Sequence, residues 1–108
     1  MPKKLKILHK DFVLRTMNPV EVLDHDGAWG GINGVTGEIL YNEAPQKSET
    51  VDTLIHETLH GIVRMMDMRD FADKENEELI VSRFATGLTT VFRDNPEFLK
   101  AIQLMLKA

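Results

Sequence analysis

The stretch TLIHETLHGI, residues 53–62, places two histidines four positions apart within an amphipathic helical pattern. Side chains at positions i and i+4 lie on one face of an α-helix, so His56 and His60 can direct imidazole nitrogens to one point. Glu57 lies about 100° around the helix axis from His56. The motif therefore predicts either a metal site, with Glu57 as general base beside it, or an ordinary packed helix carrying two histidines.

The apolar period around this stretch predicts a helix over residues 49–68, with Ser48 as its N-cap. A second helix is expected over residues 74–92, and a third begins at Asp94 or Asn95 with Pro96 at its first helical position. The first helix should turn inward Val51, Leu54, Ile55, Leu59, Ile62 and Met66. The second should turn inward Leu79, Val81, Phe84, Ala85, Leu88 and Phe92.

The first half of the chain has the alternation and turn residues typical of strands. KILHKDFVLRT (residues 6–16) predicts a strand, or a strand preceded by a helical turn, and VEVLD (20–24) predicts a short strand. Five glycines in residues 25–37 indicate turns around a brief extended piece at 28–32, and GEILYNE (37–43) is the clearest strand. Strands followed by helices predict an α+β fold, with a small antiparallel or mixed sheet of about three strands and then three helices. Residues 1–108 are expected to form a single domain.

The amino-acid composition limits the metal ligands, the binding partners and the location that the protein can have. The chain has no cysteine, so any metal must be held by His, Asp or Glu side chains. A net charge of -4 lacks the basic footprint of a nucleic-acid-binding protein, and no apolar run approaches the length of a membrane span. The basic N-terminal residues precede no apolar signal segment, so we expect a cytoplasmic protein.

A catalytic zinc site needs a third protein ligand. The metzincin pattern requires glycine and histidine where this chain has Val63 and Met66, so that class is excluded. The third ligand is sought among the acidic residues that open the second predicted helix, namely Glu75, Glu77 and Glu78. Glu78 shares a helical face with the apolar residues of that helix and is favoured, whereas Glu75 and Glu77 fit a solvated helix start.

These elements resemble a known group, the small phage- and prophage-encoded zinc metallopeptidases related to ImmA/IrrE-like and minimal gluzincin folds. The resemblance covers most of the chain and is carried by GEILYNEAP, TLIHETLHGI, ENEELIVSRFATGL and VFRDNPEFL. It implies a zincin-like domain binding one Zn²⁺ per chain through His56 and His60, with Glu57 as catalytic base. The third ligand that it implies is a glutamate of the following helix, best matched by Glu78.

The predicted function is therefore hydrolysis of peptide bonds by a zinc-activated water and a glutamate base. An extended peptide is expected to pair with the strand before the motif, which makes Ile39 and Tyr41 candidate substrate-binding residues. Trp29 is expected to be a packing anchor rather than a substrate platform. Residues available to stabilise an oxyanion are Tyr41, His9, His25 and Arg64.

Two alternatives stay open. One is a zinc-binding, non-catalytic regulatory or adaptor protein of a phage, and a site without a cleft would favour it. The other is a structural or interaction protein with no metal. The sequence leaves open the natural substrate, the oligomeric state and whether the chain is active alone.

Overall fold

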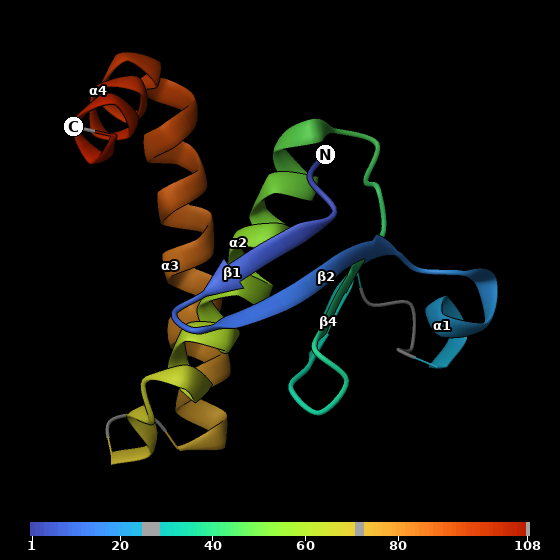
Figure 1. Cartoon of the computed structure of the whole chain (residues 1–108). Coiled ribbons are helices and arrows are strands. Elements are labelled where there is room, and N and C mark those ends of the chain that lie inside the picture. Colours follow the sequence, from blue (N-terminus) through green and yellow to red (C-terminus); the bar gives the residue numbers. More distant parts are fainter. Residues whose placement is uncertain (25–28, 71–72, 108) are drawn as a thin grey trace.

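The computed structural model describes residues 1–24, 29–70 and 73–107, and Figure 1 shows their arrangement. The strands are β1 (Lys4–Ile7), β2 (Lys10–Thr16), β3 (Gly30–Asn33) and β4 (Glu38–Tyr41). The helices are α1 (Pro19–Asp24), α2 (Lys47–Met65), α3 (Lys74–Asp94) and α4 (Pro96–Leu106), with a 3₁₀ turn at Met68–Asp70. The predicted α+β class is confirmed. The described part differs from the expected three strands and three helices, since it has four of each.

The sheet is mixed, with strand order β1-β2-β4-β3. β1 runs antiparallel to β2, β2 parallel to β4, and β3 antiparallel to β4. β4 therefore lies inside the sheet with hydrogen-bonded neighbours on both sides. The expectation that this strand offers an edge to a peptide is wrong, and β3 is the edge next to it.

The first predicted strand is in fact a hairpin. β1 and β2 pair in a register that sets Ile7 opposite Lys10, which leaves a two-residue turn of Leu8 and His9. Leu8 has a φ of 55°, a left-handed conformation that leucine rarely adopts. Such turns are usually marked by asparagine, aspartate or glycine, so the sequence carries no signal for this one.

Residues 20–24, predicted as a strand, belong to helix α1. The Asn18 side chain accepts a hydrogen bond from the Glu21 backbone N–H at 2.9 Å, and Glu21 accepts one from the Asn18 N–H at 3.0 Å. This reciprocal pair is a capping box, and Pro19 occupies the first helical position that suits proline. The sequence N-P-V-E at residues 18–21 is therefore the local pattern that indicates a helix start here.

One face of the sheet packs on α2 to form the core (Figure 1). Its buried members are Ile7, Phe12, Leu14 and Ile39, and Leu5, Ile32, Leu54, Ile62 and Met65 pack around them. Gly61 allows the close approach of helix and sheet, since a Cβ there would lie 2.5 Å from Ile7 Cδ1. Gly61, the residue after His60, therefore packs directly against the sheet.

The long helices lie close to their predicted positions, but some details differ. Gln46 is the N-cap of α2, so the prediction of Ser48 is wrong, whereas α4 has Asn95 as N-cap and Pro96 in its first turn, as expected. Val81 and Ala85 are buried as predicted. Four residues expected to face inward are exposed, namely Val51, Met66, Leu79 and Phe84. Leu79 and Phe84 belong to α3, whose contacts in the described part of the chain are with α2 and α4 alone.

α3 packs along α2 and makes no substantial contact with any described strand. Its buried residues Val81, Ala85 and Thr89 recur every four positions and form the stripe that meets α2. α4 packs only on α3 and buries none of its residues. In the part of the chain that the structure describes, no helix is both long and apolar enough to cross a membrane.

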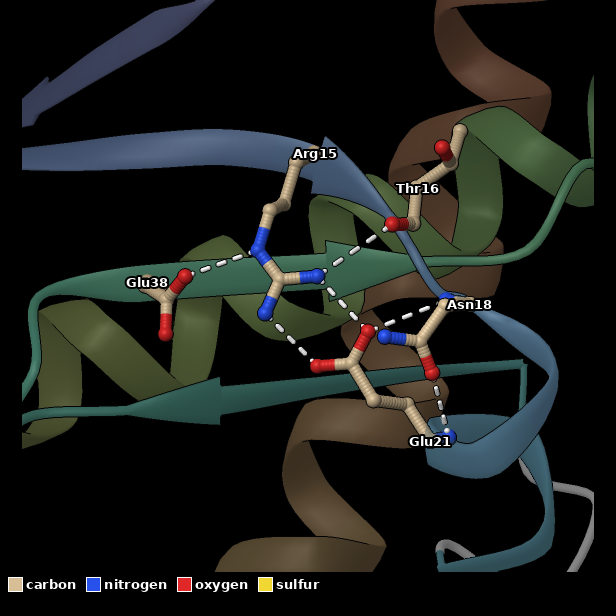
Figure 2. Close-up of polar contacts among 5 residues, drawn as sticks. All are labelled: Arg15, Thr16, Asn18, Glu21 and Glu38. Atoms are coloured by element: carbon tan, nitrogen blue, oxygen red, sulfur yellow. Dashed lines mark hydrogen bonds and ion pairs between the residues drawn. The ribbon is translucent and has the colours of Figure 1, made fainter.

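Arg15 ties α1 and β4 together, as Figure 2 shows. Its Nη1 and Nη2 atoms donate to the two carboxylate oxygens of Glu21 at 2.7 and 2.6 Å. Its Nε donates to Glu38 Oε2 at 2.7 Å. The hydrogen bond from Arg15 lowers the pKa of Glu38 below its ordinary value, because the guanidinium favours the carboxylate form.

This lowered pKa predicts a pH-dependent contribution to stability. The contribution is present above the unfolded-state value near 4.5 and is lost as the pH falls through the lower folded-state pKa. Glu38→Gln should therefore reduce the free energy of unfolding at pH 7, and the difference from wild type should shrink on acidification. Urea denaturation at pH 7 and pH 3 measures it, with the exposed Glu43→Gln as charge-matched control. Equal loss at both pH values would contradict the assignment.

Candidate metal centre

The two histidines of α2 approach one another as their spacing predicts. His56 Nε2 and His60 Nε2 are 3.1 Å apart, and the ring centroids are 4.8 Å apart. Gly61 faces the sheet, whereas the imidazole rings of His56 and His60 lie on another face of α2, next to α3. Both Nε2 atoms are therefore presented to the first turns of α3.

Glu78 of α3 faces both histidines. Its Oε1 lies 2.9 Å from His56 Nε2, and its Oε2 lies 2.8 Å from His60 Nε2. The carboxylate reaches this position because Glu78 is three residues before the buried Val81, on the side of α3 that packs against α2. Its side chain is 60% exposed, whereas the side chains of His56 and His60 are 23% and 11% exposed.

Glu77 also belongs to this cluster, which the sequence interpretation did not expect. Its Oε2 lies 2.6 Å from His60 Nδ1, and its side chain is 21% exposed. The expectation that Glu77 only solvates the helix start is therefore wrong. Glu77 and Glu78 are neighbours about 100° apart on α3, so they can reach the two nitrogens of one imidazole ring. Glu75 is exposed, in agreement with its predicted position.

The hydrogen bonding decides which nitrogen of His60 is free to bind a metal. A carboxylate accepts, so Glu77 favours the tautomer of His60 that carries its proton on Nδ1. Nε2 then presents a lone pair toward His56 Nε2 and Glu78. Two nitrogen lone pairs and a carboxylate at separations of about 3 Å repel one another unless a proton or a cation lies between them.

The separations among these atoms suit zinc. Zn–N bonds of about 2.0 to 2.1 Å at tetrahedral angles place ligand atoms about 3.3 Å apart. The two histidine Nε2 atoms are 3.1 Å apart, and they lie 2.9 and 2.8 Å from different oxygens of the Glu78 carboxylate, all slightly less than this spacing. Two imidazoles and a carboxylate fit a divalent zinc ion and leave a fourth position for a further ligand.

Glu57 lies beside the histidines and is buried. One carboxylate oxygen of Glu57 and one ring nitrogen each of His56 and His60 all lie within 4.8 Å of one another. The oxygens of Glu78 are closer to those nitrogens, so Glu78 is the better third ligand and Glu57 is left beside the site. Glu57 Oε2 has no hydrogen-bond partner in the described part of the chain, and burial raises the pKa of Glu57 to about 7.

A cleft with a volume of about 300 Å³ opens beside this cluster. It is lined by His56, Glu57 and Glu78 together with Trp29, Gly30, Asp52 and Thr53. Trp29 is 49% exposed at its edge, so the expectation of a packing anchor is wrong. A Cβ at Gly30 would lie 2.6 Å from Thr53 Cγ2 and 3.2 Å from Glu57 Cγ, which shows how closely the start of β3 meets α2.

The other expected site residues do not line this cleft. Ile39 is fully buried in β4, and Tyr41 is 5% exposed and borders a different cavity. Their predicted substrate-binding role depended on β4 being an edge strand.

The other residues considered for stabilising an oxyanion lie elsewhere. His9 lies in the β1–β2 turn, Arg64 borders another cavity with Glu77, and His25 lies outside the described residues.

Comparison with known proteins found no matching family model, no matching curated protein and no matching solved structure.

The contact between Glu77 and His60 predicts a contribution to metal affinity. A carboxylate that orients a metal-binding histidine typically contributes about 10- to 100-fold in affinity. Glu77→Ala should weaken zinc binding by that factor, measured by competition with a chromophoric chelator. Glu75→Ala removes the same charge from the same helical turn and should leave affinity unchanged. Equal affinity in the two variants would show that Glu77 does not support the site.

Because Glu57 is buried, its ionised carboxylate is expected to lower the free energy of unfolding. Its folded-state pKa is about 7 against an ordinary value of 4.5, so folding is penalised progressively between these values and fully above them. In chelator, Glu57→Gln should raise the free energy of unfolding at pH 8 by about 3 kcal/mol and change it little at pH 4. Urea denaturation measures both, with Glu75→Gln as the exposed control. A Glu57→Gln protein less stable than wild type at pH 8 would contradict this.

Proposed function

We propose that the protein is a zinc-dependent metallopeptidase that holds one Zn²⁺ per chain through His56, His60 and Glu78. The observation that carries the proposal is the convergence of two imidazole Nε2 atoms and one carboxylate within 3.1 Å, beside a buried glutamate. The histidines and glutamates come from two helices that pack together, so the arrangement is held by tertiary structure.

Bound zinc would lower the pKa of a coordinated water to about 7 and polarise the carbonyl of the scissile bond. The protein's own contribution is proton transfer and orientation. Glu57 lines the same cleft as His56 and Glu78, where its carboxylate takes the proton of the attacking water and delivers it to the leaving amine. Glu77 holds the His60 ring through Nδ1 and so keeps Nε2 directed at the ion.

We assign peptide positioning to β3 rather than β4. β3 is the edge strand of the sheet, and its first residue, Gly30, lines the cleft. An extended peptide pairs with such an edge through backbone hydrogen bonds, which hold it with little dependence on its side chains. The strand contacts α2 beside Glu57, so a peptide on this edge passes the site.

The cleft favours this proposal over a zinc-binding adaptor protein, because a purely structural zinc site has no need of a cavity beside it. The zincin-like architecture, the kinship with phage-encoded metallopeptidases and a cytoplasmic location, in the host cell for a phage-encoded protein, are part of the same proposal. They are supported by the motif, by the mixed sheet lying on the histidine-bearing helix and by the glutamates of the following helix.

Replacement of Glu57 tests the catalytic step. Zinc-loaded wild type should cleave members of a mixed library of unstructured peptides, and Glu57→Gln should retain one zinc per chain while its rate falls by at least about 100-fold. Mass spectrometry of the products and elemental analysis of the protein provide the two readouts. Undiminished cleavage by a zinc-loaded Glu57→Gln would refute the role of Glu57. Zinc binding by wild type without cleavage of any library member would favour the non-catalytic alternative.

A further inference from the structure

Trp29 and Asp52 line the cleft and take no part in the proposed chemistry. Trp29 is the only tryptophan of the chain and is 49% exposed, although it precedes a strand that packs on α2. Asp52 lies on α2 four positions before His56 and lines the same cleft. We propose that Trp29 and Asp52 form a subsite that binds a lysine or arginine side chain of the peptide next to the scissile bond. Its description as a substrate subsite rests on the proposed peptidase function.

The negative charge of the cleft favours binding of a cation. Its lining contains the carboxylates of Asp52, Glu57 and Glu78 and includes no lysine or arginine among the described residues. A zinc ion would offset Glu57 and Glu78 in formal charge, which leaves the charge of Asp52 uncompensated. A basic side chain is therefore attracted to this cleft, and an acidic one is repelled.

Asp52 is oriented for such a contact. Thr86 of α3 donates its hydroxyl to Asp52 Oδ2 at 2.9 Å, which fixes the carboxylate from the neighbouring helix. Its other oxygen has no protein partner in the described part of the chain. Asp52 is one helical turn from His56, about 6 Å along the axis, a distance comparable to the length of a lysine side chain. The cation of a residue beside the scissile bond can therefore reach it.

Trp29 supplies the surface for the alkyl part of that side chain. Its backbone is held because its C=O accepts a hydrogen bond from Asn42 N–H at 2.7 Å and because Gly30 is pressed against Thr53 and Glu57. The exposed indole can bind an aliphatic stem and also attract the cation through its π face. An acidic cleft without this ring would lack the apolar contact.

Glu57 independently indicates that the cleft receives a ligand. It is 5% exposed, lines the cavity, and its Oε2 has no hydrogen-bond partner among the described residues. A buried carboxylate oxygen without a partner is rare in folded proteins, because its desolvation is uncompensated. A hydrogen-bond donor from outside the chain would satisfy it, and the cleft is the available route of approach.

Trp29 fluorescence allows a direct test, since it is the only tryptophan. Capped five-residue peptides with lysine, norleucine or glutamate at the central position are titrated into zinc-loaded and chelator-treated wild type. The lysine peptide should bind about fivefold or more tightly than the norleucine peptide, which has the same stem without the charge, and the glutamate peptide should bind most weakly. Equal binding of lysine and norleucine peptides, or no binding of any, would overturn the proposal.

Variants of Asp52 test whether this residue causes the preference for the lysine peptide over the norleucine peptide. Asp52→Asn should bind lysine and norleucine peptides alike, Asp52→Glu should restore the preference, and the exposed Asp11→Asn should behave as wild type. Lysine preference that persists in a folded Asp52→Asn protein would overturn the subsite. Hydrolysis and zinc content are measured on the same samples. Lysine-selective binding without hydrolysis would refute the peptidase but keep the subsite, and hydrolysis without lysine preference would refute the subsite alone.

Discussion

The packing of α3 on α2 is the constraint on which the candidate site depends. Val81 and Ala85 meet α2 one and two turns after the acidic residues, and Ala85 is fully buried. A small residue there lets the two helices approach closely enough for Glu77 and Glu78 to reach both nitrogens of His60. Because α3 touches no described strand, the site has no second support from the sheet on this side. Metal binding and helix packing should therefore strengthen one another.

The opposite side of α2 is fixed by the sheet. At Gly61 and Gly30 the helix and the sheet approach closely, since added carbon atoms at those positions would collide with Ile7 and Thr53. These contacts hold Glu57 under the start of β3, where its carboxylate is buried and its pKa is raised. The ionised carboxylate of Glu57 is therefore unfavourable in its buried position next to the histidines. Such locally destabilising groups are common at functional sites, where the packing of the surrounding core maintains them.

The sequence predicted what depends on helical periodicity and missed what depends on tertiary pairing. The positions of His56, Glu57 and His60 follow from spacing along one helix, and Glu78 follows from its place beside the apolar stripe of α3. Glu77 was missed because periodicity places it off that stripe, whereas its contact depends on how far α3 is rotated against α2.

The errors in the sheet have similar causes. The β1–β2 hairpin turns at Leu8, which carries no turn signal. Residues 20–24 form a helix and not the predicted strand, because the capping box of Asn18 and Glu21 starts α1 there. The strand order that puts β4 inside the sheet depends on long-range pairing of β2 with β4, which no local pattern encodes. The substrate-binding roles predicted for Ile39 and Tyr41 depended on that strand order.

The most direct test of this account is the zinc content of protein purified without chelator or affinity-tag nickel, determined by elemental analysis for wild type, His60→Ala and Glu78→Ala. The account predicts about one zinc per wild-type chain and its loss in both variants. Wild-type protein that stays free of metal after zinc is added back would contradict it, and residues 53–62 would then be an amphipathic helix with two histidines. Zinc retained in full by Glu78→Ala would contradict the ligand assignment.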